Sequence, residues 1–314
     1  MAQASIEILG TVIAPGGKAQ IDLEVAKLHT SSAVKIPIIV QHAKKSGPVL
    51  LLLAGVHGDE INGIEIVRQI VKKGLNKPTR GTVICIPVLN IFGFLNFSRE
   101  LPDGRDLNRC FPGAPNGSLA GQFAHAFMKN IVPKVDYIID FHTGAAQRHN
   151  YPQVRCVSNN ENALNIAKVF DPPFIKQSKL IPKSLREAVS KRGKNIILFE
   201  GGKANRIDDF VVKEGIRGVL RVMNHLKIIT IEVEQAREAK IISEAKWLRS
   251  PASGMFRAEV MNGSYIEKGT VLGIVSDPFG KVEKKVKAPQ NGYIFCVNQA
   301  PIVNKGDAIF NLGW

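Results

Sequence analysis

The sequence is poor in cysteine. Its 314 residues include four cysteines, which are widely scattered and form no Cys-x-x-Cys pair. A disulfide framework and a sulfur-ligated zinc site both depend on characteristic cysteine spacings, so neither is indicated here. We expect these residues to be reduced thiols that are mostly buried. They are Cys85, Cys110, Cys156 and Cys296.

Long hydrophobic segments are also missing. The longest apolar run, PVLLLLAGV at residues 48–56, is far shorter than the roughly 20 residues that a membrane helix needs. The first residues, MAQASIEILGTVIAPGG, lack the basic segment and sustained apolar stretch of a secretory signal. With 45% hydrophobic and 22% charged residues, the composition is that of a folded globular protein. We therefore predict a cytoplasmic protein with no membrane partner.

No tract of positive charge stands out, although the formal net charge is +15. The lysines and arginines are spread along the chain rather than packed into one segment interleaved with aromatic residues, so we do not expect a nucleic-acid partner. A basic field that attracts small anionic substrates explains the charge equally well.

Apolar runs of strand length alternate with helical patterns from about residue 34 onward. Near-continuous apolar strands between helices are typical of an α/β sheet whose strands are largely parallel. In the first predicted helix, apolar residues recur at helical spacing and Gly74 follows as a stop. The expected strands are 34–40, 48–56, 82–90, 136–142 and 195–202, and the expected helices are 60–73, 118–132, 161–170, 183–192 and 208–226.

The pattern changes at about residue 248 to short strands broken by glycine and proline, which predicts an all-β module over residues 248–314. Its halves echo each other, because the Pro-x-x-Gly segment at 251–254 returns at 289–292. This pseudo-repeat indicates a small barrel or sandwich of two interlocked halves. We divide the chain into an α/β domain over residues 1–240, which begins with a β segment at 1–33, and this module.

Three polar residues able to bind a metal each close a predicted apolar strand: His57, His142 and Glu200. Ligands of open α/β sheets bind at the carboxyl ends of the strands, so these residues should meet at one rim. Glu60 follows His57 by three residues, where a helix begins. Two imidazoles and a carboxylate suit Zn²⁺ and leave a coordination position open for water. We predict one zinc ion per chain, bound by His57, Glu60 and His142.

The other histidines lack this context. His149 lies near His142 but in a polar loop, which makes it a weak rival ligand. We expect the remaining histidines to lie on the surface; they are His29, His42, His125 and His225.

A second cluster of polar residues occupies the loop at residues 98–113, SRELPDGRDLNRCFPG. It contains Arg99, Arg105, Asn108 and Arg109. A planar guanidinium donates two parallel hydrogen bonds to a carboxylate. Beside a metal site, this loop is predicted to bind an anionic group of the substrate.

Four segments, GVHGDE, DGRDLNRCFPG, DFHTG and LFEGG, follow one another in this order. Together they resemble the succinylglutamate desuccinylase/aspartoacylase family, a branch of the zinc carboxypeptidase superfamily, over about residues 34–314. The resemblance implies a mixed sheet flanked by helices and a zinc-hydrolase catalytic domain over residues 1–240. It also implies the residue roles: zinc on His57, Glu60 and His142, Glu200 as general base, a substrate carboxylate on Asn108 and Arg109, and Arg99 or Arg105 polarising the scissile carbonyl.

Asp140 stands two residues before His142, on the same side of the predicted strand. From there it could orient this ligand.

The C-terminal module resembles the biotinyl/lipoyl-type barrel. Lys281 falls close to the position of the lysine that carries the cofactor in lipoyl domains, but the surrounding residues, DPFGKVEKK, lack the usual context. We therefore predict a packing or substrate-covering module without a covalent cofactor.

These observations favour a zinc-dependent amidohydrolase that removes the acyl group from an N-acyl amino acid or a related small anion. A metallocarboxypeptidase acting on short peptides is the close alternative. A non-catalytic member of the fold is the alternative from a different class. The sequence leaves the oligomeric state open, with a homo-oligomer as one option.

Overall fold

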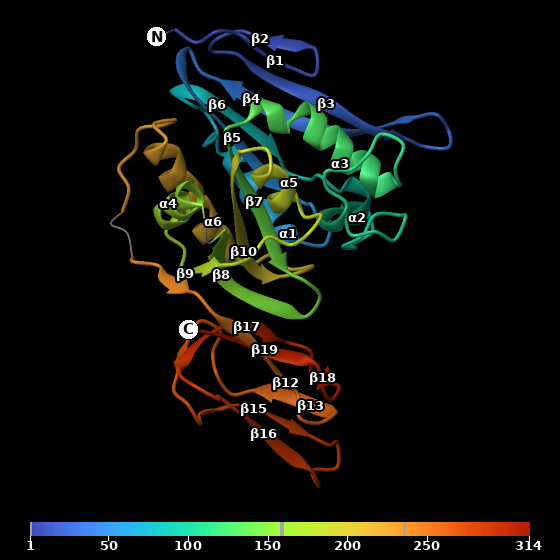
Figure 1. The fold of residues 1–314 in the computed structure, drawn as a ribbon, viewed down its shortest axis with the longest axis vertical. Coiled ribbons are helices and arrows are strands. Elements are labelled where there is room, and N and C mark those ends of the chain that lie inside the picture. The colour runs from blue at the N-terminus through green and yellow to red at the C-terminus, as the bar shows by residue number, and fades with distance from the viewer. Residues whose placement is uncertain (1, 158–159, 235–236) are drawn as a thin grey trace.

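The computed structural model describes residues 2–157, 160–234 and 237–314 (Figure 1). A large mixed sheet runs through most of the molecule. Its four central strands, β6, β5, β7 and β10, are parallel. In order, the sheet contains β12 (Ala245–Arg249), β19 (Ala308–Gly313), β17 (Gly292–Asn298), β8 (Arg148–Cys156), β10 (Asn195–Lys203), β7 (Tyr137–Gly144), β5 (Lys45–Ala54), β6 (Arg80–Ile86), β4 (Ala33–His42) and β3 (Lys18–Lys27).

Three shorter strands join this sheet beside the main path, and a separate pair lies at the N-terminus. The three are β9 (Phe174–Gln177), β11 (Lys240–Ile242) and β14 (Tyr265–Ile266), and the pair is β1 (Ile6–Ile8) with β2 (Thr11–Ile13).

All five predicted helices form close to their expected bounds. They are α1 (Ile61–Lys72), α3 (Leu119–Asn130), α4 (Glu161–Phe170), α5 (Leu185–Ser190) and α6 (Asp209–His225). The short helices α2 (Ile91–Leu95), η1 (Leu107–Arg109) and η2 (Val132–Lys134) complete the set in the described ranges. No helix within those ranges has the length and hydrophobicity needed to cross a membrane.

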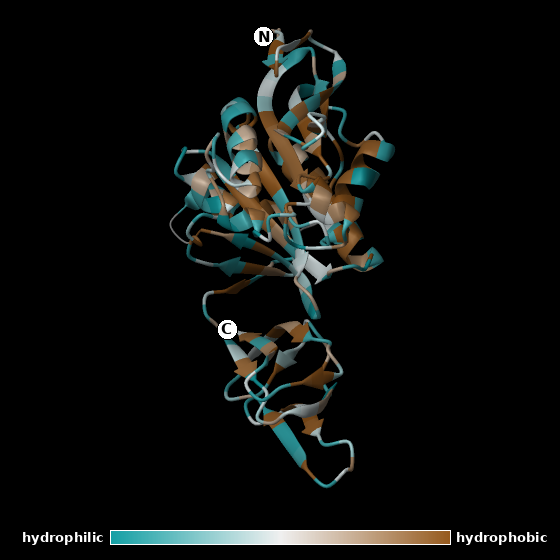
Figure 2. Ribbon diagram, turned by 90° about the vertical axis from the view of Figure 1, so that its right-hand side faces the viewer, coloured by the Kyte–Doolittle hydropathy of each residue, from teal (hydrophilic) through white to brown (hydrophobic). Residues whose placement is uncertain are grey.

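The sheet separates two hydrophobic cores because successive side chains of a strand point to opposite faces. In β5, Leu51 and Leu53 pack into the core that includes α3 and α5. Leu50 and Leu52 pack into the other core, which includes α1, α4 and α6. Figure 2 shows the hydrophobic residues concentrated in these central strands. Burial on both faces explains why the central strands are nearly continuous apolar runs.

The expected α/β class and the mixed sheet implied by the family resemblance are confirmed, but the largely parallel sheet indicated by the apolar strand pattern is wrong. Strands β3 and β4 are antiparallel, as are β4 and β6, and β8 runs antiparallel to β10. Strand β8, RHNYPQVRC, was not predicted because its polar residues give it no apolar run. Several of these polar side chains face a cavity rather than a core.

The C-terminal residues form a second, antiparallel sheet, with the order β16 (Glu283–Lys287), β15 (Val271–Ser276), β13 (Gly254–Ala258) and β18 (Ile302–Val303). It shares a small core with β17 and β19. Strand β17 also pairs with β8, so the large sheet continues into the C-terminal part of the chain (Figure 1). Lys281 lies in the connection between β15 and β16.

Candidate active site

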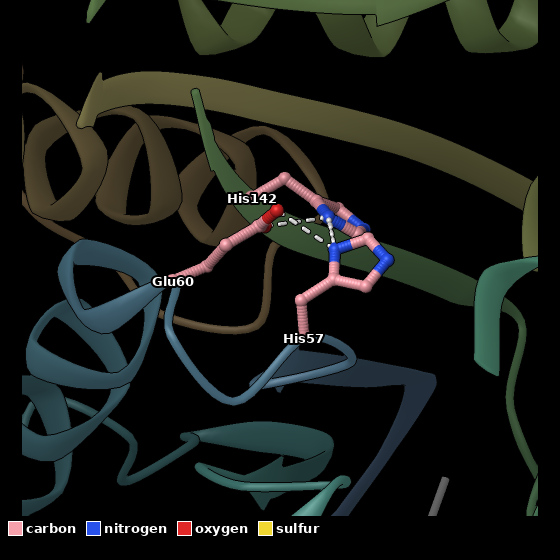
Figure 3. Close-up of side chains that lie close together, drawn as sticks. All are labelled: His57, Glu60 and His142. Atoms are coloured by element: carbon pink, nitrogen blue, oxygen red, sulfur yellow. Dashed lines mark hydrogen bonds and ion pairs between the residues drawn. The ribbon is translucent and has the colours of Figure 1, made fainter. Parts of the chain in front are cut away.

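His57, Glu60 and His142 meet at the carboxyl ends of the parallel strands (Figure 3). His57 follows β5, Glu60 is the N-cap residue of α1, and His142 lies in β7. Nδ1 of His57 lies 2.7 Å from Oε1 of Glu60. Nδ1 of His142 lies 2.8 Å from Oε2 of Glu60. All three side chains are buried, so three metal-ligand groups face one another out of contact with solvent.

A carboxylate contacts the far nitrogen of each imidazole. Nε2 of His57 lies 3.0 Å from Asp106, and Nε2 of His142 lies 2.9 Å from Asp140. Contacts of this kind place the proton on Nε2 and leave the lone pair of Nδ1 directed at the shared centre. Asp140 thus lies where the strand alternation predicted it.

The electrostatics favour positive charge at this centre. Burial alone would raise the pKa of Glu60, but His57 and His142 hold that pKa well below its usual value. Burial opposes protonation of His142, yet Asp140 and Glu60 raise its pKa well above the ordinary range. The pKa of His57 is also raised, mainly by Glu60 against the effect of burial.

Arg99 lies directly beside the cluster. Its Nη1 donates to Oε1 of Glu60 at 3.1 Å, and its Nη2 donates to Asp106 at 2.9 Å. Arg105, the competing candidate, is exposed and its closest ionic partner is Asp103. The structure therefore brings Arg99 to the cluster and leaves Arg105 outside it.

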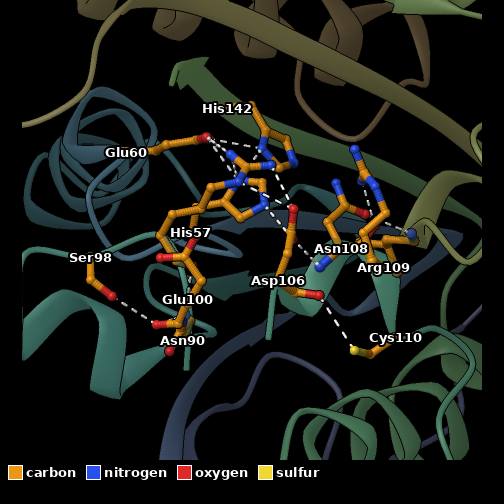
Figure 4. Close-up of polar contacts among 12 residues, drawn as sticks. His57, Glu60, Asn90, Ser98, Glu100, Asp106, Asn108, Arg109, Cys110 and His142 are labelled. Carbon is orange, nitrogen blue, oxygen red and sulfur yellow. Dashed lines mark hydrogen bonds and ion pairs between the residues drawn. The ribbon is translucent and has the colours of Figure 1, made fainter. Parts of the chain in front are cut away.

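Asn108 and Arg109 lie in η1, which follows Asp106 and lies beside the cluster (Figure 4). Oδ1 of Asn108 accepts a hydrogen bond from the backbone of Leu185 at the start of α5. Nη1 of Arg109 donates to the carbonyl oxygen of Asn108 at 2.7 Å. The Arg109 side chain is otherwise exposed at the mouth of the cavity and is available to a ligand.

Glu200 lies in β10, and its Cα is paired with that of His142 across the parallel ladder. Nδ2 of Asn150 donates to Oε2 of Glu200 at 2.6 Å, and Nη1 of Arg155 lies 3.3 Å from Oε1. Both partners come from β8. The carboxylate is thereby oriented toward the same cavity as the cluster.

The residues described above surround a cavity of about 460 Å³. Both parts of the chain contribute to its wall, because Trp247 and Asn311 line it beside the strand ends of the α/β part. The ring of Trp247 also lies 5.3 Å from the guanidinium carbon of Arg148.

Sequence reasoning missed Asp106, which contacts His57, and several residues of the cavity wall, namely Asn150, Arg155, Lys176, Arg186, Trp247 and Asn311. Asp106 stands within the predicted substrate loop and could have been found there. The others are isolated polar residues whose convergence depends on the pairing of strands distant in sequence.

Two predictions about histidines can be compared with the structure. His149, which the sequence analysis gave as a weak rival ligand, contacts Asp208 and Asn262 rather than the cluster. The prediction of a surface position for His42 is wrong, because this side chain is buried and lies 2.8 Å from the hydroxyl of Thr82. The reason is that its strand, β4, is covered at that end by the N-terminal residues.

Comparisons with known proteins agree with this fold. The chain is similar to the N-alpha-acetyl-L-2,4-diaminobutyric acid deacetylase of Halomonas elongata, with 28% identity over 293 residues, 88% of this chain and 85% of that protein. The fold resembles that of a succinylglutamate desuccinylase/aspartoacylase from Rhodobacter sphaeroides, with a TM-score of 0.85, 24% identity and coverage of 100% and 98% of the two chains. It also resembles the product-bound ectoine utilization protein EutE (DoeB) from Ruegeria pomeroyi, with a TM-score of 0.82, 23% identity and coverage of 94% of each chain.

A family model extends this agreement to the sequence. The model of the succinylglutamate desuccinylase/aspartoacylase catalytic domain matches residues 46–226, which is more than half of the chain and includes all the proposed metal ligands. The chain therefore belongs to the succinylglutamate desuccinylase/aspartoacylase family.

Proposed function

We propose that the protein is a zinc-dependent amidohydrolase that cleaves the amide bond of an N-acyl amino acid or a related small anion. Its membership of a family of deacylases and its similarity to an N-acetyl amino acid deacetylase support this proposal. We also propose that it acts in the cytoplasm.

The observation that carries the proposal is the arrangement of His57, Glu60 and His142. With protons on both Nε2 atoms, the two Nδ1 atoms and the Glu60 carboxylate are all acceptors, and the two Nδ1 atoms lie only 3.2 Å apart. Acceptors this close to one another attract positive charge, and Nη1 of Arg99, 3.1 Å from both Nδ1 of His57 and Oε1 of Glu60, supplies part of it from one side. Two imidazoles and one carboxylate match the donor set of a catalytic zinc site.

A zinc ion held by these residues would polarise a carbonyl group and acidify a water molecule. Glu200 faces the same cavity and can accept a proton from water and then pass it to the nitrogen of the leaving amine. Arg99, beside Glu60, can donate hydrogen bonds to the oxygen on which negative charge develops. Asn108 and Arg109, which line the same cavity from η1, can hold the substrate carboxylate.

A carboxypeptidase acting on short peptides uses the same chemistry and is the second candidate. The cavity of about 460 Å³ is within the range of small-molecule pockets and is walled in part by the C-terminal residues Trp247 and Asn311. This enclosure favours a small substrate over a peptide.

The test is an activity screen of the zinc-loaded protein. It compares N-acetyl, N-succinyl and N-formyl amino acids, including N-acetyl-L-2,4-diaminobutyrate, with short peptides. We expect turnover of at least one N-acyl amino acid, and loss of that turnover after chelation of the metal. Faster cleavage of peptides would support the carboxypeptidase, and a metal-loaded protein inert toward both classes would support a non-catalytic role.

A further inference from the structure

The C-terminal part of the chain contains a groove of about 510 Å³ between β12 and β16. Residues 246–249 and Pro251 line it from one side, and residues 285–287 and Pro289 line it from the other. A groove on one face of a strand would contact alternate residues, because successive side chains point to opposite faces. Consecutive residues of both strands line this groove, so it follows the edges of the two strands.

Both of these edges are open. Within the described ranges, β12 pairs with β19 alone and β16 pairs with β15 alone, so each is the last strand of its sheet (Figure 1). The backbone groups on the outer edge of such a strand are free to pair with a further strand. β16 has the more regular edge, because its pairing is continuous from Glu283 to Val286, whereas β12 is irregular between Leu248 and Arg249.

The pseudo-repeat of the C-terminal module places a basic residue on each wall. Pro251 and Pro289 begin the two Pro-x-x-Gly segments. Arg249 stands two residues before the first proline, and Lys287 stands two residues before the second. The two halves of the repeat therefore form a groove with positive charge on both sides.

This charge is unpaired. The basic lining residues are Lys246, Arg249, Lys285 and Lys287, and no described lining residue is acidic. All four side chains are exposed, and in the described ranges none of them forms an ion pair with a carboxylate. Between them lie the buried Leu248 and Val286 and the half-buried Trp247. The groove thus combines apolar surface with free positive charge.

An extended acidic peptide segment matches these features best. Its backbone can pair with the open edge while its carboxylates meet the basic side chains. A nucleic acid has no backbone N–H donors for the carbonyl groups of the edge. A second copy of this chain is repelled, because its β12 and β16 carry the same positive charge.

We propose that the groove between β12 and β16 is a docking site for an extended acidic segment of a partner protein. The segment adds as a strand to β16, and the basic residues of both walls bind its carboxylates. This inference does not depend on the proposed deacylase function, because none of the residues assigned to catalysis lines the groove.

The experiment measures the binding of a peptide to the full, zinc-loaded chain by fluorescence anisotropy. The probe is a labelled peptide with blocked ends in which glutamate and valine alternate, about six residues long like an ordinary strand. A second peptide has lysine in place of each glutamate. An oligothymidylate of the same charge as the glutamate peptide tests for binding of nucleic acid.

The test variant is the double substitution Lys285→Glu and Lys287→Glu. The matched control is Lys18→Glu with Lys27→Glu, which alters two exposed lysines of β3, the last strand at the other end of the large sheet. Both variants change the net charge equally. All four positions are exposed, so we expect both proteins to fold, and thermal unfolding checks this.

We expect the wild type to bind the glutamate peptide and to reject the lysine peptide. The test variant should bind the glutamate peptide at least about tenfold more weakly, because two attractive contacts become repulsive. It should also bind the lysine peptide more tightly than the wild type does. The control variant should behave like the wild type. Hydrogen exchange at residues 283–287 should slow when the glutamate peptide is bound, because strand pairing protects the amides of the edge.

Four results would overturn the proposal. They are an absence of peptide binding, an equal loss of affinity in the control variant, binding that leaves exchange in β16 unchanged, and tighter binding of oligothymidylate than of the glutamate peptide. The last result would assign the groove to nucleic acid. None of them bears on the deacylase, which is tested by turnover.

Discussion

Glu200 is the single residue on which the proposed chemistry depends most. Its carboxylate is held from β8 by Asn150 and Arg155 and faces the cavity beside His142. A carboxylate oriented in this way can accept a proton without first changing its conformation, which is the property that a general base requires.

The first prediction is that Glu200→Gln binds zinc like the wild type but loses most activity. Glutamine has the same size and its amide oxygen can still accept from one of the two donors in β8, yet the amide cannot take a proton from water. We expect kcat to fall by about 10² to 10⁴. Metal analysis and initial rates measure the two effects, and near-normal turnover would assign the base to another residue.

The second prediction concerns Arg109, whose planar guanidinium can bind a carboxylate through two parallel hydrogen bonds. Lysine keeps the charge but not this geometry. Because Arg109 is exposed at the cavity mouth, we expect Arg109→Lys to reduce kcat/KM for a carboxylate substrate by about 1.5 kcal/mol, or about tenfold. The matching carboxamide should lose much less. An equal loss on both substrates would show that Arg109 acts on the structure of the loop.

The third prediction is a pH dependence due to Lys176. Arg155, Arg186, Glu200 and Cys296 surround this lysine, and its pKa is lowered to about 8 chiefly by burial and by Arg155. A small anion bound in the cavity that Lys176 lines raises that pKa, so the affinity for a small carboxylate probe such as glutarate is constant below about pH 8 and falls as the pH rises above it. Calorimetry of glutarate binding at about pH 7 and about pH 9.5, below and above the pKa of Lys176, measures the decrease in affinity.

The Lys176→Met variant serves as the control for this pH dependence. It should lack the part of the decrease that is due to the lysine. A wild type and a variant whose affinities fall in parallel would assign the titration to another group.

At the level of elements, the parallel strands bring the site together. β5, β7 and β10 end at the same edge of the sheet, so His57, His142 and Glu200 meet although they are far apart in sequence. Within β7, the alternation of side chains places Asp140 on the same face as His142, where its Oδ2 lies 2.9 Å from Nε2.

The fourth prediction tests this strand. Asp140→Asn should weaken zinc binding by roughly 10- to 100-fold, because the neutral amide no longer fixes the tautomer and basicity of His142. Competition with a chelator measures the affinity. The control is Asp136→Asn, because Asp136 is exposed and lies just before β7, six residues before His142. This variant should keep the zinc affinity of the wild type. Unaltered zinc affinity in Asp140→Asn would exclude an orienting role.

At the scale of the whole molecule, the two parts of the chain share one sheet. Cys296, Val297 and Asn298 of β17 pair with β8, and Trp247 and Asn311 complete the cavity wall. The edge of β8 is therefore covered by the C-terminal part, which protects its backbone groups from pairing with other chains.

The fifth prediction is that the whole chain unfolds in one cooperative transition. Both tryptophans, Trp247 and Trp314, report on the C-terminal part, whereas the described helices all lie before residue 226. Tryptophan fluorescence and helical circular dichroism should therefore give coincident denaturant curves. Two separated transitions would show that the parts unfold independently and that the β8–β17 pairing contributes little.

The sequence by itself was sufficient to predict many of the helices and strands of this protein and the candidate metal ligands. The five helices, the central strands and the position of His57, Glu60 and His142 at strand ends followed from local patterns, because periodicity and residue type depend on neighbours along the chain. The free cysteines, three of them buried, followed from their spacing in the same way.

Only the tertiary structure placed the remaining parts. Three features depend on contacts between segments that are distant in sequence: the antiparallel position of β8, the placement of Arg99 rather than Arg105 beside Glu60, and the cluster of Arg155, Lys176 and Arg186. Isolated polar residues carry no local signal, because the burial and the partners that give each its chemistry come from segments that are distant in the sequence and meet only when the chain folds.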